Sequence, residues 1–172
     1  MPITPDTKDW TWVTERPCPE CGFDPAGMTP ERIGPALLAS VPRWQAALAE
    51  PGVGIRPDGS TWSVLEYAAH VRDLCRVFET RLRLMLDQDN PDFPDWDQDA
   101  AAVEGQYASL DPLAVAQELA AAAAEAAAGF NAVTPAEWDR SGTRSNGSVF
   151  TVTTLGSYFL HDVMHHLHDV GA

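Results

Sequence analysis

Apolar residues recur at helical spacing in four segments of this chain, which alternate with stretches rich in proline, glycine and aspartate. The segments span about residues 30–50, 62–88, 112–129 and 153–170. Capping residues precede the first three, at Thr29, at Ser60-Thr61 and at Asp111. Pro42 falls inside the first segment and should kink or split that helix, because proline lacks the N–H that an interior helical position donates.

Two stretches between the helices have a different pattern. Residues 87–104 form an acidic loop, with aspartates at 87, 89, 92, 95, 97 and 99 around Phe93 and Trp96, and loops of this length are usually functional or disordered. Asn146-Gly147 is a hairpin-turn signal, and short strands at 138–140 and 149–151 could flank it. The pattern therefore predicts an all-α four-helix bundle over residues 29–172, with a small β-hairpin before the last helix.

Residues 1–28 are rich in proline and tryptophan, and we expect an irregular N-terminal arm that lies over the core. The whole chain carries a net charge of −14 with Lys8 as its single lysine, which argues against nucleic acids and anionic membranes as partners. The polar N-terminus, the absence of an apolar run near 20 residues and the small number of cysteines favour a reduced, cytoplasmic setting. Heavy use of Ala, Arg and Pro suggests a GC-rich genome.

Four of the five histidines lie between His161 and His168. His161 and His165 are four residues apart and share one helix face with His168, so they could offer two imidazoles to one ion. The fifth histidine, His70, lies mid-helix among apolar neighbours, where a lone histidine is more often a satisfied core residue. However, helical bundles build metal sites from facing helices, and three imidazoles leave the open coordination position that is typical of catalytic zinc.

Two motifs carry a family resemblance. Trp62-Ser63 opens a helix that reaches His70 eight residues later, and His161-x-x-x-His165 follows about ninety residues further on. This arrangement resembles the DinB/YfiT-like superfamily of four-helix metalloproteins. The resemblance implies an up-down-down-up bundle and a divalent metal, zinc or nickel, held by His70, His161 and His165.

The resemblance extends over about residues 31–170 and implies a function. Relatives include metal-dependent thiol transferases and the N-terminal domain of mycothiol-dependent maleylpyruvate isomerase. We therefore expect a metal-dependent enzyme with a small-molecule substrate, such as a thiol transferase with a low-molecular-weight, mycothiol-like cosubstrate, or a hydrolase. The alternatives are a non-catalytic metal-binding or stress-associated bundle and a structural domain whose histidines bind nothing. Such bundles commonly form homodimers.

Metal-bound histidines usually donate their second nitrogen to a carboxylate or carbonyl, so supporting residues are expected nearby. Glu66 and Asp73 lie about one turn from His70, and Asp169 lies one turn after His165. His168 could be a further ligand or a supporting residue. Trp96 and Phe93 of the acidic loop, or Arg140 and Arg144 of the hairpin, could shape the mouth of the site.

The arm contains Cys18-Pro-Glu-Cys21-Gly, which has the turn of a zinc knuckle and lies outside the family pattern. A structural zinc usually needs four ligands, and the sequence has no second cysteine pair. The pair could hold a second zinc with His166, His168 or a carboxylate, act as a redox couple, or simply pack. Cys75 lies in the apolar stripe of the second helix, so we expect a buried, inert thiol.

Overall fold

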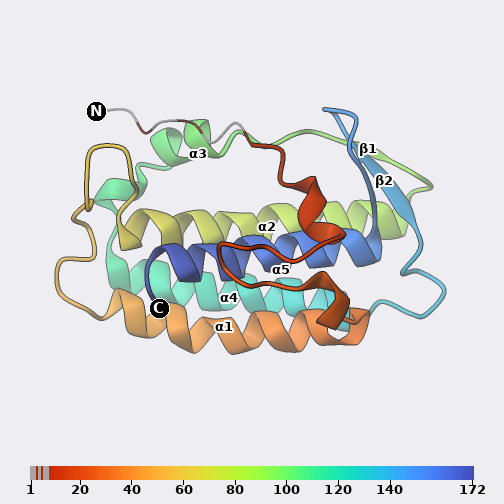
Figure 1. Ribbon diagram of the computed structural model, residues 1–172, viewed down its shortest axis with the longest axis horizontal. Helices are drawn as coiled ribbons and strands as arrows, with labels where there is room; N and C mark the ends of the chain where they lie inside the picture. Colours follow the sequence, from red (N-terminus) through yellow and green to blue (C-terminus); the bar gives the residue numbers. More distant parts are fainter. Residues whose placement is uncertain (1–2, 4, 6–7) are drawn as a thin grey trace.

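The four long helical segments of the sequence form a bundle in the computed structural model, which describes residues 3, 5 and 8–172 (Figure 1). The bundle helices are α1 (Ile33–Leu48), α2 (Val64–Asp87), α4 (Pro112–Asn131) and α5 (Val152–Asp169). Both α1 and α2 pack against α4 and α5. Helices α2 and α4 run in one direction while α1 and α5 run in the other, which is the expected up-down-down-up arrangement (Figure 1).

Local sequence explains where most helices begin. Asp111 accepts a hydrogen bond from the Ala114 N–H at the start of α4, with proline at the first helical position. The N-cap of α2 is Ser63, three residues after the expected Ser60-Thr61, because Ser63 and Glu66 form a reciprocal capping box. Pro42 stays inside α1 without ending it, since it lies on the exposed face, where water can reach the carbonyl that it leaves unbonded.

The bundle interior combines aromatic stacking with small residues. Phe159 of α5 stacks on Phe78 of α2 and on Phe130 of α4, with ring centroids 4.9 and 6.1 Å apart. A Cβ atom on Gly156 would lie 2.5 Å from the Ile33 side chain, so glycine permits this close helix contact. Helix α4 is long and apolar enough to cross a membrane, but length and composition alone are weak evidence for a membrane span. In this structure α4 packs against α1 and α2.

The acidic loop and the hairpin meet beside the bundle. The hairpin strands are β2 (Ser141–Arg144) and β3 (Val149–Thr151), so the first strand begins three residues after the expected 138–140. Strand β1 (Asp92–Phe93) pairs in parallel with β2, which gives a three-stranded sheet. The stretch at 87–104 is therefore partly regular, because it also contains helix α3 (Gln98–Glu104), which Asp97 caps.

The N-terminal arm runs across α5 in short turns (Figure 1). It contains the 3-10 turns η1 (Thr11–Thr14) and η2 (Pro25–Gly27). A third such turn, η3 (Pro30–Arg32), leads into α1, and a fourth, η4 (Tyr107–Ser109), precedes α4. Val13 and Cys18 of the arm are fully buried, and the arm contributes to the main hydrophobic core through Cys18 and Phe23. The arm therefore covers the histidine-bearing helix rather than extending into solvent.

Candidate metal centre

His161 and His165 lie on the buried face of α5, one turn apart, with ring centroids separated by 5.1 Å. The helix that positions them starts at a capping box between Thr151 and Thr154. Neither ring nitrogen of His161 has a hydrogen-bond partner among the described residues. An unpartnered imidazole in the protein interior is costly unless another ligand occupies its lone pair, so this pair is suited to hold a cation.

Burial makes these imidazoles neutral near pH 7. Burial, together with the neighbouring His165 and His166, lowers the pKa of His161 to about 4. Burial also lowers the pKa of His165, although Asp169 and Glu20 partly oppose that shift. A neutral imidazole is the form that binds metal, because its lone pair is free.

The arm brings two thiols to the same place. Cys18 Sγ lies 3.7 Å from His165 Nδ1, and the ligand atoms of Cys18, Cys21, His161 and His165 all lie within 4.8 Å of one another. Burial raises the pKa of Cys21 to about 11. Both kinds of donor suit zinc, which thiolate and imidazole ligands bind in tetrahedral sites.

Carboxylates face the other nitrogen of His165. Its Nε2 lies 3.6 Å from Glu20 Oε2 and 3.7 Å from Asp169 Oδ1. These acceptors favour a proton on Nε2, which leaves the Nδ1 lone pair directed toward Cys18. Asp169 lies near His165 from one turn later on α5, whereas Glu20 comes from the arm and no helical spacing could have indicated it.

His70 lies in a neighbouring aromatic cluster. Its ring stacks on Trp96 at 5.2 Å and contacts Trp62 and His166 at 5.3 and 4.8 Å, and these are its ring contacts within the part of the chain that the structure describes. Both of its nitrogens are buried without a hydrogen-bond partner among the described residues. Burial, followed by the effect of His166, lowers its pKa well below the usual value. His70 is therefore neutral, but its ring nitrogens do not belong to the cluster of ligand atoms from the two cysteines and the α5 histidine pair.

The remaining histidines have other surroundings. His166 Nδ1 lies 2.9 Å from Asp169 Oδ2, and its ring contacts His70 and Tyr67 rather than joining the cysteine pair. His168 is exposed, with its ring 6.4 Å from that of His165. The structure thus places Cys18 and Cys21 with His161 and His165, whereas the sequence alone suggested His166 or His168 for that role.

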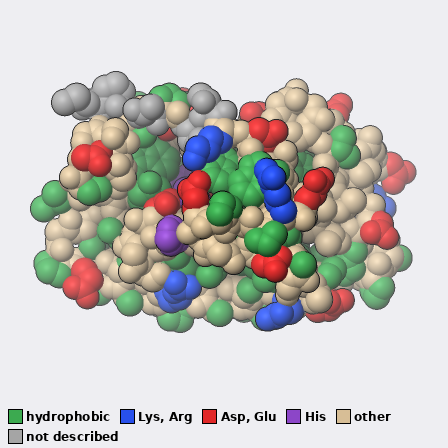
Figure 2. Space-filling view, viewed as in Figure 1, with side chains coloured by type: hydrophobic (Ala, Val, Ile, Leu, Met, Phe, Trp, Pro, Cys, Tyr) green, Lys and Arg blue, Asp and Glu red, His purple; other side chains and the backbone are tan. Residues whose placement is uncertain are grey.

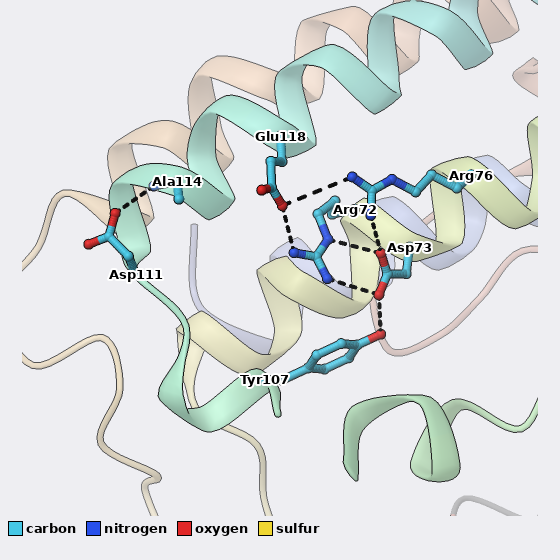
Figure 3. A network of polar contacts seen from close by, with 7 residues as sticks. All are labelled: Arg72, Asp73, Arg76, Tyr107, Asp111, Ala114 and Glu118. Carbon is cyan, nitrogen blue, oxygen red and sulfur yellow. Dashed lines mark hydrogen bonds and ion pairs between the residues drawn. The ribbon is translucent and has the colours of Figure 1, made fainter. Parts of the chain in front are cut away.

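The two acidic residues near His70 have structural partners. Glu66 accepts hydrogen bonds from Arg56 and Ser63 at the start of α2. Asp73 accepts from Arg72, Arg76 and the hydroxyl of Tyr107, while Arg72 also reaches Glu118 on α4 (Figure 3). This network joins α2 to α4 and η4. Cys75 is fully buried, and burial raises its pKa to about 12, as expected for an inert thiol.

A cavity of about 840 Å³ opens beside the centre. Its walls include His161, His165, Trp10, Trp62, Trp96 and Arg144. Arg144 is held by Asn146 and Ser148 and lies 3.6 Å from Asp95, so its charge is fixed on the wall and partly paired. Arg140 instead donates hydrogen bonds to the backbone carbonyls of Met85 in α2 and of Gln88, the residue that caps α2. Phe93 is buried in the core. Little histidine surface is visible on the face that the arm crosses (Figure 2).

Comparison with known proteins agrees with this architecture. The solved structure described as "YfiT from Bacillus subtilis is a probable metal-dependent hydrolase with an unusual four-helix bundle topology" is similar, with a TM-score of 0.71 and 17% identity. The match covers 81% of this chain and 82% of that one. No curated protein matches. The family model of the DinB superfamily matches residues 46–170, which is most of the chain, and the chain therefore belongs to the DinB superfamily.

Proposed function

We propose that this protein is a divalent-metal-dependent enzyme that acts on a small molecule in the cavity beside α5. One observation carries the proposal: His161 is buried with both ring nitrogens unpartnered among the described residues, and it forms part of a cavity wall. A cavity of about 840 Å³ is of the size that small-molecule sites have.

His161, His165 and His70 are the ligands of this proposal. The orphaned nitrogens of His70 and His161 fit a metal better than they fit a core role, because buried polar atoms are normally hydrogen-bonded. All three imidazoles have lowered pKa values, through burial first, so they are unprotonated near neutral pH. A divalent ion with three imidazole ligands supplies a Lewis acid with an open coordination position.

The cavity walls provide the substrate contacts. Arg144 is almost fully buried, and its guanidinium also lies over the rings of Phe150 and Tyr158 at 5.5 and 5.7 Å. A fixed guanidinium binds a carboxylate or phosphate group, so we infer an anionic group on the substrate. The indoles of Trp10 and Trp96 offer flat apolar surfaces for the rest of the molecule.

The reaction would be nucleophilic substitution at an electrophilic carbon. Water or a low-molecular-weight thiol would form the new C–O or C–S bond, the bond from that carbon to its leaving group would break, and the proton of the nucleophile would pass to the leaving group. Similarity to a protein described as a probable metal-dependent hydrolase supports the first choice. The thiol transferase reading, with a mycothiol-like cosubstrate, rests on the family resemblance of the two histidine motifs.

A paired screen of the full chain loaded with Zn²⁺ or Ni²⁺ tests the proposal. The first assay supplies esters and amides that carry an anionic group and measures their hydrolysis by water. The second assay supplies electrophiles together with small thiols. Turnover that disappears in His161→Ala but persists in Cys75→Ser supports the enzyme. Metal binding without turnover in either assay supports the second candidate function, a non-catalytic metal-binding bundle. The clustering of four ligand atoms favours this candidate.

A further inference from the structure

We propose that Cys18 and Cys21 of the arm complete a Cys₂His₂ zinc site with His161 and His165 of α5. This site differs from the three-histidine set above and binds zinc whether or not the protein is an enzyme. It accounts for the burial of Cys18, which is 1% exposed, against a helix that carries two buried imidazoles.

The interatomic distances are close to those of a tetrahedral site. Zn–S bonds of about 2.3 Å and Zn–N bonds of about 2.0–2.1 Å place neighbouring ligand atoms about 3.4–3.8 Å apart. Cys18 Sγ and His165 Nδ1 already lie 3.7 Å apart, and no pair among the four ligand atoms exceeds 4.8 Å. Movements of about 1 Å would therefore close a tetrahedron around one ion.

The arm backbone has a turn that directs both sulfurs to one side. The Cys18 N–H donates to the Phe23 carbonyl at 2.8 Å, and the Gly22 N–H donates to the Cys18 carbonyl at 2.9 Å. Gly22 has a φ of +76°, a left-handed conformation that glycine adopts without strain. The backbone N–H of Phe23 also hydrogen-bonds the sulfur of Cys21, which fixes the position of that sulfur in the turn.

Charge and surroundings favour zinc in particular. Two thiolates balance the charge of a divalent ion, so the complete centre is neutral and can be buried. Mixed sulfur and nitrogen ligands in a tetrahedron are typical of zinc. Glu20 and Asp169 face Nε2 of His165, and Trp10 and Phe23 lie against the His161 ring at 5.5 and 5.6 Å. The site thus has supporting carboxylates and an aromatic cover.

The two ligand sets share His161 and His165, so a single ion cannot satisfy both. With the cysteines bound, all four tetrahedral positions are filled by protein and the ion has no open position. The arm conformation seen here therefore corresponds to a coordinatively saturated centre. An open position that faces the cavity requires that at least one sulfur leave the ion.

X-ray absorption of the full-length, tag-free, reduced protein with one equivalent of Zn²⁺ tests the site. We expect two sulfurs at about 2.3 Å and two nitrogens at about 2.0–2.1 Å. Cys18→Ser/Cys21→Ser should lose the sulfur shell, whereas Cys75→Ser and His70→Ala should keep it. With Co²⁺ in place of zinc, thiolate-to-cobalt charge-transfer absorption should be present in the proteins that keep the sulfur shell and absent from the double cysteine variant. Circular dichroism checks that each variant remains helical.

The outcomes separate this site from the proposed function. A nitrogen- and oxygen-only shell in the wild type, or a sulfur shell that survives the double cysteine substitution, overturns the Cys₂His₂ site. Sulfur ligation without turnover supports the site and leaves the enzyme proposal without support. Turnover that needs His70 in a protein with no sulfur ligation supports the enzyme and rejects this site.

Discussion

Cys18 and His165 lie 147 residues apart in the chain, yet Sγ of the first is 3.7 Å from Nδ1 of the second. The contact joins the N-terminal arm to the last helix of the bundle. An ion bound between them would cross-link almost the whole chain, and such a closure restricts the unfolded state most when the enclosed loop is long.

Zinc should therefore raise the thermal stability of the protein. An ion that binds only the folded state at 100 times its Kd adds about 2.7 kcal/mol, which corresponds to a Tm increase of about 5–10 °C for a chain of this length. Differential scanning calorimetry with zinc and with a chelator measures the difference. The Cys18→Ser/Cys21→Ser variant should show little of it, and an equal shift in that variant would contradict the arm site.

Glu20→Gln should weaken zinc binding by about 10-fold or more, because Glu20 faces the nitrogen of His165 that points away from Cys18. Competition titration with a chromophoric chelator gives the affinity. Glu15→Gln, an exposed glutamate of the same arm, is the matched control and should leave the affinity unchanged. Equal affinities for all three proteins would show that Glu20 does not support the site.

His70→Phe should separate stability from function. It removes two buried nitrogens that lack hydrogen-bond partners among the described residues and keeps a flat ring against Trp96. We expect the metal-free protein to become about 1 kcal/mol more stable toward urea, because the cost of an unsatisfied buried polar group is removed. Turnover should be lost if His70 is a ligand. A variant that is both less stable and fully active would contradict both roles.

Asp73→Asn should destabilise the protein at neutral pH but not in acid. Burial alone would raise the pKa of Asp73, but hydrogen bonds from Arg72 and Tyr107 outweigh it and hold the pKa below its usual value. A depressed folded-state pKa contributes stability above the unfolded value of about 3.9, which is lost as the pH falls through the folded value. We expect a loss of about 2 kcal/mol at pH 7.

Urea unfolding at pH 7 and pH 3 measures this dependence. The difference between wild type and Asp73→Asn should shrink progressively as the pH falls below about 4, because the stability that ionised Asp73 contributes is lost as the pH falls through its lowered folded-state pKa. Asp139→Asn, at an exposed aspartate, serves as the control. A difference that is constant across this range would assign the effect of Asp73 to packing alone.

Much of the bundle could be predicted from local sequence. The Asp111-Pro112 start of α4 and the Asn146-Gly147 turn were confirmed, since caps and turns depend on a few adjacent residues. Two features could not be predicted in this way. The pairing of Asp92 with Thr143 depends on how the acidic loop returns to the hairpin, and the partners of Cys18 depend on how the arm packs.

The histidine cluster illustrates this limit. Helical spacing showed that His161 and His165 share a face and that His166 points elsewhere. It could not show which of these faces the arm would cover, because that choice depends on distant contacts such as the burial of Val13. The expected grouping of His70 with the α5 pair stays a prediction, and the metal experiments above address it.

Trp10 lies against both imidazoles of the α5 pair, with ring centroids 5.5 Å from His161 and 5.0 Å from His165. The protein thus contains an intrinsic optical reporter next to its candidate centre. Cobalt or copper bound there would quench indole emission at short range, so occupancy could be followed by fluorescence without an added dye. A Trp10→Phe variant would identify that signal among the six tryptophans of the chain.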